Sequence, residues 1–425
     1  MFVHWRFVGG GPRRLWLVGV AVLSGCGVGG GTSDTDASRQ TLSLSSLRFN
    51  DEDAVFEGGP NDLIETAELI DLSPGPQTIR GRIDPRADVD VFDLGPAGRG
   101  DRIVVDTLMA PALQGAVALF DDTGASLLVN DHRNVYLGQR EPFIDVILRR
   151  GSGACYLAVS ATPGFASTGE YALMASKQSE VPVPRPRPDT ILLSFDGGES
   201  VRIGSRPAIQ VPPFDAASID ARFAGTTEEM LTLVVAAVRE DYRGLGVTIL
   251  STSEGAVNDG SMSRLFFGTF DSALLGVAEG VDEFNATKSQ EAIVFTDTFE
   301  AFLRLDPSVE EMATALANVA AHEIGHLLGL VHVADRQGLM DVTASLNDLL
   351  LDQWFSRAPI HSGVFPIGMQ DAIQYLLDAV GGDVSQTGKQ LFGYDAHEKA
   401  RLAPSGPPAR GEWCLSTCGL DELPE

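Results

Sequence analysis

The fold is decided by one stretch of eleven residues, His322-Glu323-Ile324-Gly325-His326-Leu327-Leu328-Gly329-Leu330-Val331-His332. Residues four apart lie on one face of a helix, so His322 and His326 can present two imidazoles to one metal ion. A third ligand on the same straight helix would be carried away from that ion. Gly329 supplies the necessary turn, because glycine accepts the left-handed backbone that ends helices. With His332 as third ligand, a zinc ion keeps one open position, which is typical of a catalytic site.

Glu323 directly follows the first of these histidines, and we expect it to be a general base and not a metal ligand. Zinc lowers the pKa of a bound water toward neutrality, and Glu323 lies beside that water to take its proton. The same residue can then pass the proton to a leaving amine, which predicts peptide-bond hydrolysis. The chain has only 7 histidines in 425 residues, so chance is a poor explanation for three histidines at the spacing of metal ligands.

The residues before this stretch predict one long helix. Ser308 and Glu311 form a capping-box pair, and Glu310 favours the positive end of the helix dipole. From Val309 to Leu328 such a helix is about 30 Å long. Its apolar positions suit a helix buried in the middle of a domain. They include Met312, Leu316, Val319 and Leu327.

The stretch fills every fixed position of HExxHxxGxxH, the signature of the metzincin zinc metallopeptidases. Beyond His332, Met340 stands in Gly338-Leu339-Met340-Asp341, which resembles the Met-turn beneath the metal in metzincins. The distance between His332 and Met340 is similar to that in the matrix-type members. The resemblance spans roughly residues 189–381. It implies an α+β catalytic domain with a long active-site helix, one catalytic Zn²⁺, and a protein or peptide substrate.

Other positions either extend this resemblance or depart from it. Gly276-Val277-Ala278 resembles the edge strand of the matrix-type members, which pairs with the substrate backbone by strand addition. Val342 replaces the tyrosine ligand of some metzincins, and Val333 replaces a polar residue found in several families. The other four histidines are too scattered for a second, structural zinc site. For a Ca²⁺ site or, alternatively, a solvated loop, the candidates are Asp282, Glu283 and Asp297.

The rest of this region reads as alternating strands and helices. We expect strands near Thr190–Phe195, Val247–Ser251 and Ala292–Thr296, and helices near Thr227–Tyr242 and Met369–Val380. The last helix has one apolar face and should pack on the catalytic core. Substrate preference depends on a pocket wall between Val342 and Phe365, whose depth one sequence does not give.

The region 61–178 reads as short strands separated by turn signals, which predicts a β-sandwich. Its motifs resemble in order the pre-peptidase C-terminal domain, a jelly-roll-like module of many secreted bacterial peptidases. Cys155 stands where that family often has an aromatic residue. The resemblance implies either binding of a substrate or surface, or a folding and spacer role. These motifs are Asp88-Val89-Asp90-Val91-Phe92, Leu119-Phe120-Asp121-Asp122-Thr123-Gly124, Gly153-Ala154-Cys155-Tyr156-Leu157 and Gly169-Glu170-Tyr171.

A proline-rich linker at 179–188 divides this module from the catalytic domain at 189–383. Proline alternates with other residues from Val181 to Pro188, so the linker should be extended. The tail 384–425 is rich in Gly, Pro and charge, and we expect it to be poorly ordered. Within it, Cys414 and Cys418 could form a small disulfide loop or remain two thiols.

The first 26 residues resemble a bacterial lipoprotein signal peptide. A basic front and a short apolar run end in Leu23-Ser24-Gly25-Cys26, which resembles a lipobox. The alternative is an ordinary signal peptide with a chance cysteine. Acylated Cys26 would anchor the protein by lipid alone, and residues 27–60 would form a disordered tether. We therefore expect an exported protein at the outer membrane or cell surface, or released from it.

Charge narrows the classes of partner. Asp and Glu number 58 against 31 Lys and Arg, and the formal net charge of -27 repels nucleic acid and anionic lipids. We expect a monomer that acts on proteins or peptides. The principal rival is a surface-binding or adhesive lipoprotein that keeps the zinc fold without turnover, because fold and site do not prove catalysis.

Overall fold

The computed structural model describes residues 54–383 and 385, apart from 85–87, 134–138 and 166. The signal peptide, Cys26, most of the tether, Cys414, Cys418 and nearly all of the tail lie outside the described residues. The predictions made for them, and the domain boundaries, stay predictions.

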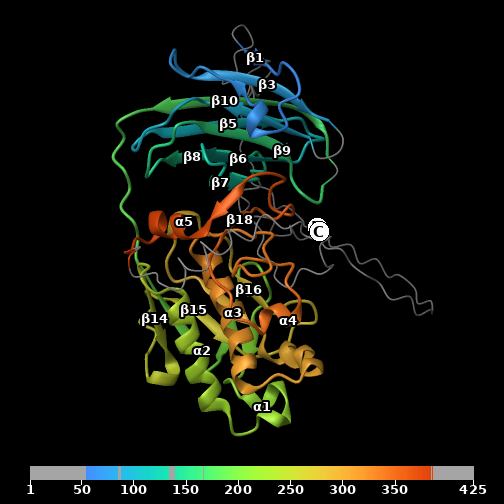
Figure 1. Ribbon diagram of the computed structural model, residues 1–425, viewed down its shortest axis with the longest axis vertical. Helices are drawn as coiled ribbons and strands as arrows, with labels where there is room; N and C mark the ends of the chain where they lie inside the picture. The colour runs from blue at the N-terminus through green and yellow to red at the C-terminus, as the bar shows by residue number, and fades with distance from the viewer. Residues whose placement is uncertain (1–53, 85–87, 134–138, 166, 384, 386–425) are drawn as a thin grey trace, which may run out of the picture. The chain divides into compact units, whose positions relative to one another are not determined.

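The first part of the described chain consists of two five-stranded sheets (Figure 1). In spatial order, sheet one contains β1 (Val55–Phe56), β3 (Gln77–Ile83), β10 (Gly169–Gln178), β5 (Arg102–Met109) and β8 (Phe143–Ile147). Sheet two contains β2 (Glu68–Leu69), β4 (Val89–Asp93), β9 (Cys155–Ala161), β6 (Gly115–Asp121) and β7 (Ser126–Asn130). Apolar side chains from both sheets form one shared core, so this part is a β-sandwich. The predicted all-β character is confirmed, and the jelly-roll-like course stays a prediction.

Sheet two is buried on both of its faces. Its inner side chains, among them Phe92 and Leu157, belong to the sandwich core. Its outer face is apolar too, and it packs against a later part of the chain. This outer layer joins Val89, Val91, Ala116, Ala118, Phe120 and Ala158 to Val331, Ile360, Val364 and Phe365. The sandwich and the following region therefore share an apolar interface.

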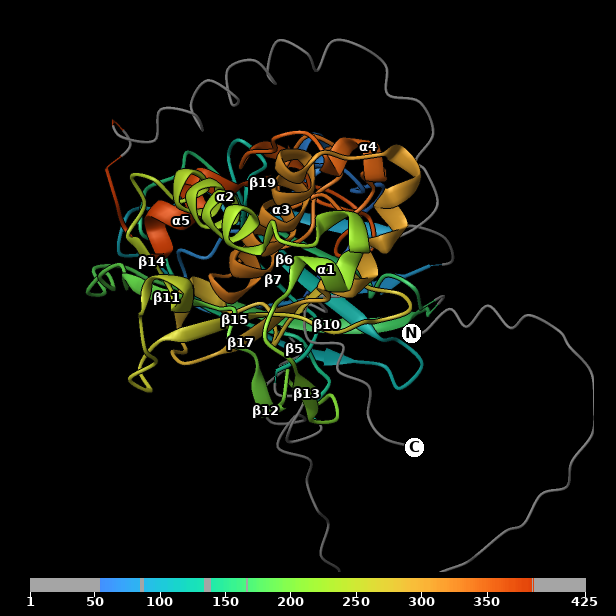
Figure 2. The ribbon, with the colours of Figure 1, turned by 90° about the horizontal axis from the view of Figure 1, so that it is seen from below.

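The second part is built on another five-stranded sheet with helices, in agreement with the expected alternation of strands and helices. Four strands are parallel and the edge strand β16 is antiparallel. The spatial order is β14 (Val247–Ser251), β11 (Asp189–Ser194), β15 (Ser263–Phe267), β17 (Glu291–Val294) and β16 (Gly276–Ala278). Helices α2 (Thr227–Asp241) and α3 (Val309–Leu327) cover one face, and β12 (Gly198–Val201) and β13 (Ile209–Val211) cover the other (Figure 2).

Short elements complete this part. They are α1 (Ala216–Ile219), α4 (Leu346–Leu349), α5 (Ala372–Ala379), β18 (Arg357–Pro359) and β19 (Met369–Asp371). The described residues also form the 3-10 segments η2 (Ile64–Thr66), η4 (Ala221–Phe223), η5 (Thr252–Glu254), η6 (Glu283–Asn285) and η7 (Thr296–Leu305). Among the described residues, no helix combines the length and the apolar character that crossing a membrane requires.

The helix predicted at Met369–Val380 begins three residues later in the structure, at Ala372. Met369–Asp371 instead forms β19, which pairs antiparallel with β18. Asp371 then caps the helix, since its side chain accepts a hydrogen bond from the Gln374 N–H at 3.0 Å. In contrast, the capping box of Ser308 and Glu311 begins α3 as predicted.

Candidate metal centre

The three histidines of the decisive stretch converge on one point. The Nε2 atom of His326 lies 3.0 Å from Nε2 of His322 and 3.1 Å from Nε2 of His332. A tetrahedral zinc ion with Zn–N bonds of about 2.0–2.1 Å needs ligand nitrogens roughly 3.4 Å apart, so small shifts would admit it. Within the described part of the chain, this trio is the one group of three or more side chains found with metal-binding spacing.

Backbone carbonyls orient two of the imidazole rings. Nδ1 of His322 lies 2.6 Å from the Leu339 carbonyl oxygen, and Nδ1 of His326 lies 2.8 Å from that of Leu330. Nδ1 therefore carries the proton and donates it, which leaves the Nε2 lone pair for a metal. Burial lowers the pKa of His326 to about 4 and that of His322 and His332 well below the ordinary value. All three rings are then neutral, the form that binds zinc.

The chain returns to the metal through a turn at Gly329. Helix α3 ends at Leu327, and Gly329 adopts a φ of +99°, which side chains rarely tolerate. A Cβ at this position would also lie 2.7 Å from the Asp282 carbonyl oxygen. The predicted role of Gly329 as the end of the helix thus corresponds to both its backbone angle and its surroundings.

Met340 packs against helix α3 at Gly325. It is 2% exposed, and a Cβ on Gly325 would come within 2.5 Å of its sulfur. The Met340 carbonyl accepts a hydrogen bond from the Val333 N–H at 2.9 Å. Because Leu339 of the same turn holds His322, this turn supports the first and third histidines together.

The carboxylate of Glu323 is fully buried and lies against the edge strand β16. A Cβ on Gly276 would overlap its Oε1 atom and come within 2.9 Å of its Cδ atom. β16 pairs with β17 on one side only and ends the sheet. The structure thus brings Gly276, Val277 and Ala278 beside the expected base.

The three acidic residues considered for calcium do not form a shared ligand group among the described residues. Asp297 accepts a hydrogen bond from the Ser218 hydroxyl at 2.6 Å, and Asp282 accepts one from the Thr287 N–H at 2.7 Å. Burial raises the pKa of Asp282 to about 6 and that of Glu283 to about 7. Nothing in this arrangement supports a calcium ion.

Sequence reasoning missed two residues beside His332. The His361 N–H donates to the His332 carbonyl at 2.9 Å, and Gln370 holds the backbone of Val331. Both depend on where β18, β19 and the loop between them lie. No motif in the sequence marks that placement.

Comparison with known proteins places a family model on this part of the chain. Residues 261–350 match the model of the matrixins, a stretch that includes β16, α3 and Met340. No curated protein matches the chain. The segment with the three histidines is similar to matrixins, and that family implies zinc.

Several solved structures are similar to portions of this chain. The pre-peptidase C-terminal domain of a Bacillus anthracis collagenase is 18% identical over 26% of this chain and 94% of its own, with a TM-score of 0.21. Archaemetzincin from Methanopyrus kandleri is 19% identical over 41% of this chain and 92% of its own, with a TM-score of 0.23. The periplasmic lysozyme inhibitor PliG of Aeromonas hydrophila is 16% identical over 26% and 99%, with a TM-score of 0.20. Because these TM-scores are low, the fold is described by the strand order given above and not by these similarities.

Proposed function

We propose that this protein is a zinc-dependent endopeptidase of the metzincin type. One observation carries the proposal: three neutral imidazoles present Nε2 atoms to a common point with Glu323 one residue after the first of them. The matrixin match over the same residues supports the choice of zinc and of a protein or peptide substrate.

The residues of this chain divide the work of peptide hydrolysis. When bound, a zinc ion supplies Lewis acidity that lowers the pKa of a water and stabilises negative charge on a carbonyl oxygen. Glu323 accepts the proton of the attacking water and delivers it to the leaving amine nitrogen. The free edge of β16 holds the substrate backbone extended by strand addition. Burial around Glu323 keeps its carboxylate in a fixed position.

The test compares wild type with Glu323→Gln, and uses Glu300→Gln, at an exposed position of η7, as the matched control. All three proteins should bind one zinc ion, because Glu323 is not a ligand. Casein cleavage should fall about 10²- to 10⁴-fold in Glu323→Gln and stay unchanged in the control. Zinc in all three proteins without cleavage by wild type would favour the binding lipoprotein.

We also propose that the protein is exported and anchored by lipid at Cys26, at the outer membrane or cell surface. The basic front, short apolar run and Leu23-Ser24-Gly25-Cys26 support this location. Growth with a labelled fatty acid should label wild type and leave Cys26→Ser unlabelled. Label in both proteins would disprove attachment at Cys26.

A further inference from the structure

Gln370 makes two hydrogen bonds with the residue before the third histidine. The Val331 N–H donates to its Oε1 atom at 2.7 Å, and its Nε2 atom donates to the Val331 carbonyl at 2.8 Å. Gln370 is 3% exposed, so water does not replace these bonds readily. A side-chain amide offers a donor and an acceptor at this spacing, whereas an ionised carboxylate cannot donate and a thioether is only a weak acceptor.

His332 needs such support more than its two partners do. His322 and His326 stand on α3, whose backbone is fixed by its own hydrogen bonds. His332 follows the Gly329 turn and lies in neither a helix nor a strand. Backbone hydrogen bonds hold this segment instead. The His361 N–H donates to the His332 carbonyl, and the Val333 N–H donates to the Met340 carbonyl. The Gln370 pair adds two contacts on the preceding residue.

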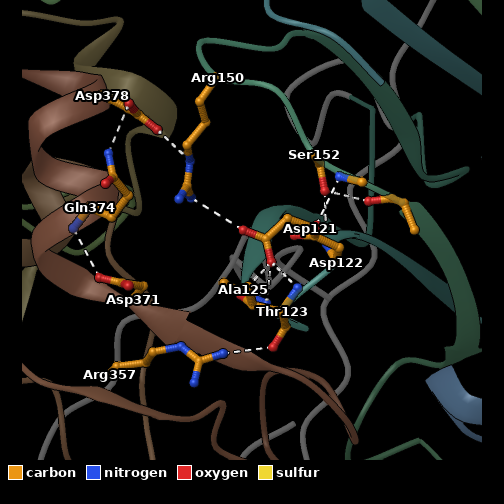
Figure 3. A network of polar contacts seen from close by, with 12 residues as sticks. Asp121, Asp122, Thr123, Ala125, Arg150, Ser152, Arg357, Asp371, Gln374 and Asp378 are labelled. Carbon is orange, nitrogen blue, oxygen red and sulfur yellow. Dashed lines mark hydrogen bonds and ion pairs between the residues drawn. The ribbon is translucent and has the colours of Figure 1, made fainter. Parts of the chain in front are cut away.

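Gln370 is itself fixed from the sandwich side. It lies in β19, whose Met369 N–H donates to the Gly124 carbonyl at 2.9 Å. The Arg357 guanidinium of the paired strand β18 donates to the Thr123 carbonyl at 2.6 Å (Figure 3). Gly368 lies so close to the Phe120 ring that a Cβ would overlap it. β19 therefore lies between the sandwich and the segment Val331–His332, which carries the third histidine.

The turn that receives β19 has a fixed shape. Asp121 accepts hydrogen bonds from the Thr123 N–H and the Ala125 N–H, both at 2.9 Å. Arg150 lies between Asp121 at 3.6 Å and Asp378 of α5 at 3.3 Å (Figure 3). Chain segments more than two hundred residues apart in sequence thus meet in one polar network.

We propose that Gln370 is a positioning residue for the third metal ligand, and that it couples the metal centre to the β-sandwich. The inference rests on the proposed function in one respect, that the ion at the histidines is zinc. Loss of the two hydrogen bonds would let the Val331–His332 backbone move. The His332 imidazole would then spend less time in the orientation that binds a metal ion. Partners behind a metal ligand are typically worth 10- to 100-fold in metal affinity.

The experiment compares Gln370→Met and Gln370→Glu with wild type in the full chain. Gln77→Met is the matched control, because Gln77 is a half-buried glutamine of β3 in sheet one whose amide donates to the Gly75 carbonyl, outside the network of Figure 3. Three quantities are measured: zinc affinity by chelator competition, the visible spectrum of the Co²⁺-substituted protein, and the melting temperature without metal. Gln370→Met should bind zinc about 10- to 100-fold more weakly and give an altered cobalt spectrum.

The control should keep wild-type zinc affinity and cobalt spectrum. Wild-type values in Gln370→Met would overturn the proposal, and so would an equal loss of affinity in Gln77→Met. If Gln370→Met does not fold, Gln370→Glu decides alone: its ionised carboxylate retains the acceptor for the Val331 N–H, loses the donor and adds a negative charge, and wild-type zinc affinity in this variant would overturn the proposal. None of these readouts needs cleavage. A wild type that binds zinc and cleaves nothing would refute the peptidase and still allow this test.

Discussion

At the scale of residues, the absence of side chains shapes the metal centre as much as the ligands do. Gly276 admits the Glu323 carboxylate, Gly325 admits the Met340 sulfur, and Gly329 lets the chain pass the Asp282 carbonyl. A methyl group at any of these positions would meet an atom of the site at less than ordinary van der Waals distance. Helix α3, the turn at Gly329 and the edge strand β16 can therefore lie this close to the three histidines only because glycine stands at each contact.

Gly276→Ala should reduce catalysis without removing the metal. The new methyl group would displace the Glu323 carboxylate, and a misplacement of about 1 Å can cost on the order of 100-fold in rate. We expect casein cleavage to fall about 10- to 100-fold while zinc content stays at one ion. Gly280→Ala is the control, because no atom lies within 4 Å of a Cβ there. Unchanged cleavage in Gly276→Ala would mean that Glu323 does not act from its observed position.

The sequence predicted those parts of the site that act through local spacing. His322, Glu323 and His326 share one helix, and Gly329 and Met340 follow closely, so period and motif were sufficient to nominate them. Gln370 contacts Val331 across 39 residues, through a strand pair of three residues each. No periodicity reports such a contact, because it depends on the tertiary placement of β19.

At the scale of elements, prediction was best where a terminus had its own signal. The capping box marked the start of α3, while β15 was missed because its residues are buried without a clear alternation. The helical spacing of Met369, Ile373, Leu376 and Val380 continued across Asp371, which hid the boundary between β19 and α5. An apolar period shows which side chains are buried, and capping residues show where the helix begins.

One hydrogen bond joins the two sheets of the sandwich, between strands β10 and β4, and we expect its contribution to stability to depend on pH. Tyr171 of β10 donates its hydroxyl hydrogen to Asp90 of β4 at 2.6 Å, and burial raises the pKa of Asp90 to about 7. The unfolded chain loses this proton near pH 3.8, so the native state binds more protons between these values. Stability from this group should therefore fall as pH rises from about 4 through 7.

Asp90→Asn should remove that dependence, because an amide keeps an acceptor for Tyr171 and never ionises. Relative to wild type, it should gain on the order of 2 kcal/mol of unfolding free energy between pH 5 and pH 8. Urea unfolding of metal-free proteins at each pH measures the difference, in which the titration of other groups cancels. Glu170→Gln, on the exposed side of β10, should follow wild type. A constant difference between Asp90→Asn and wild type would disprove the shifted pKa.

At the scale of the whole molecule, the proline-rich linker predicted a boundary between two domains, and the structure adds that sheet two of the first part packs against the second. The sequence held a sign of this in Ala116-Val117-Ala118-Leu119-Phe120, which is apolar without alternation. Such runs are typical of strands covered on both faces. We predicted a β-sandwich for this region, and the layer that covers its second face comes from residues 331–365, far along the chain.

Cutting the linker should therefore not separate the two parts. A protease site inserted between Ser179 and Glu180, both exposed and just after β10, allows the folded chain to be cut. The fragments should elute together from a sizing column at micromolar concentration and keep their zinc, because separation would expose the apolar layer of Phe120 and Phe365. Phe120→Asp in the cut protein should release the fragments, since it buries a charge at that interface. Separation of the unsubstituted fragments would show that the sandwich is an independent module, and would leave Gln370 without its support from β6 and β7.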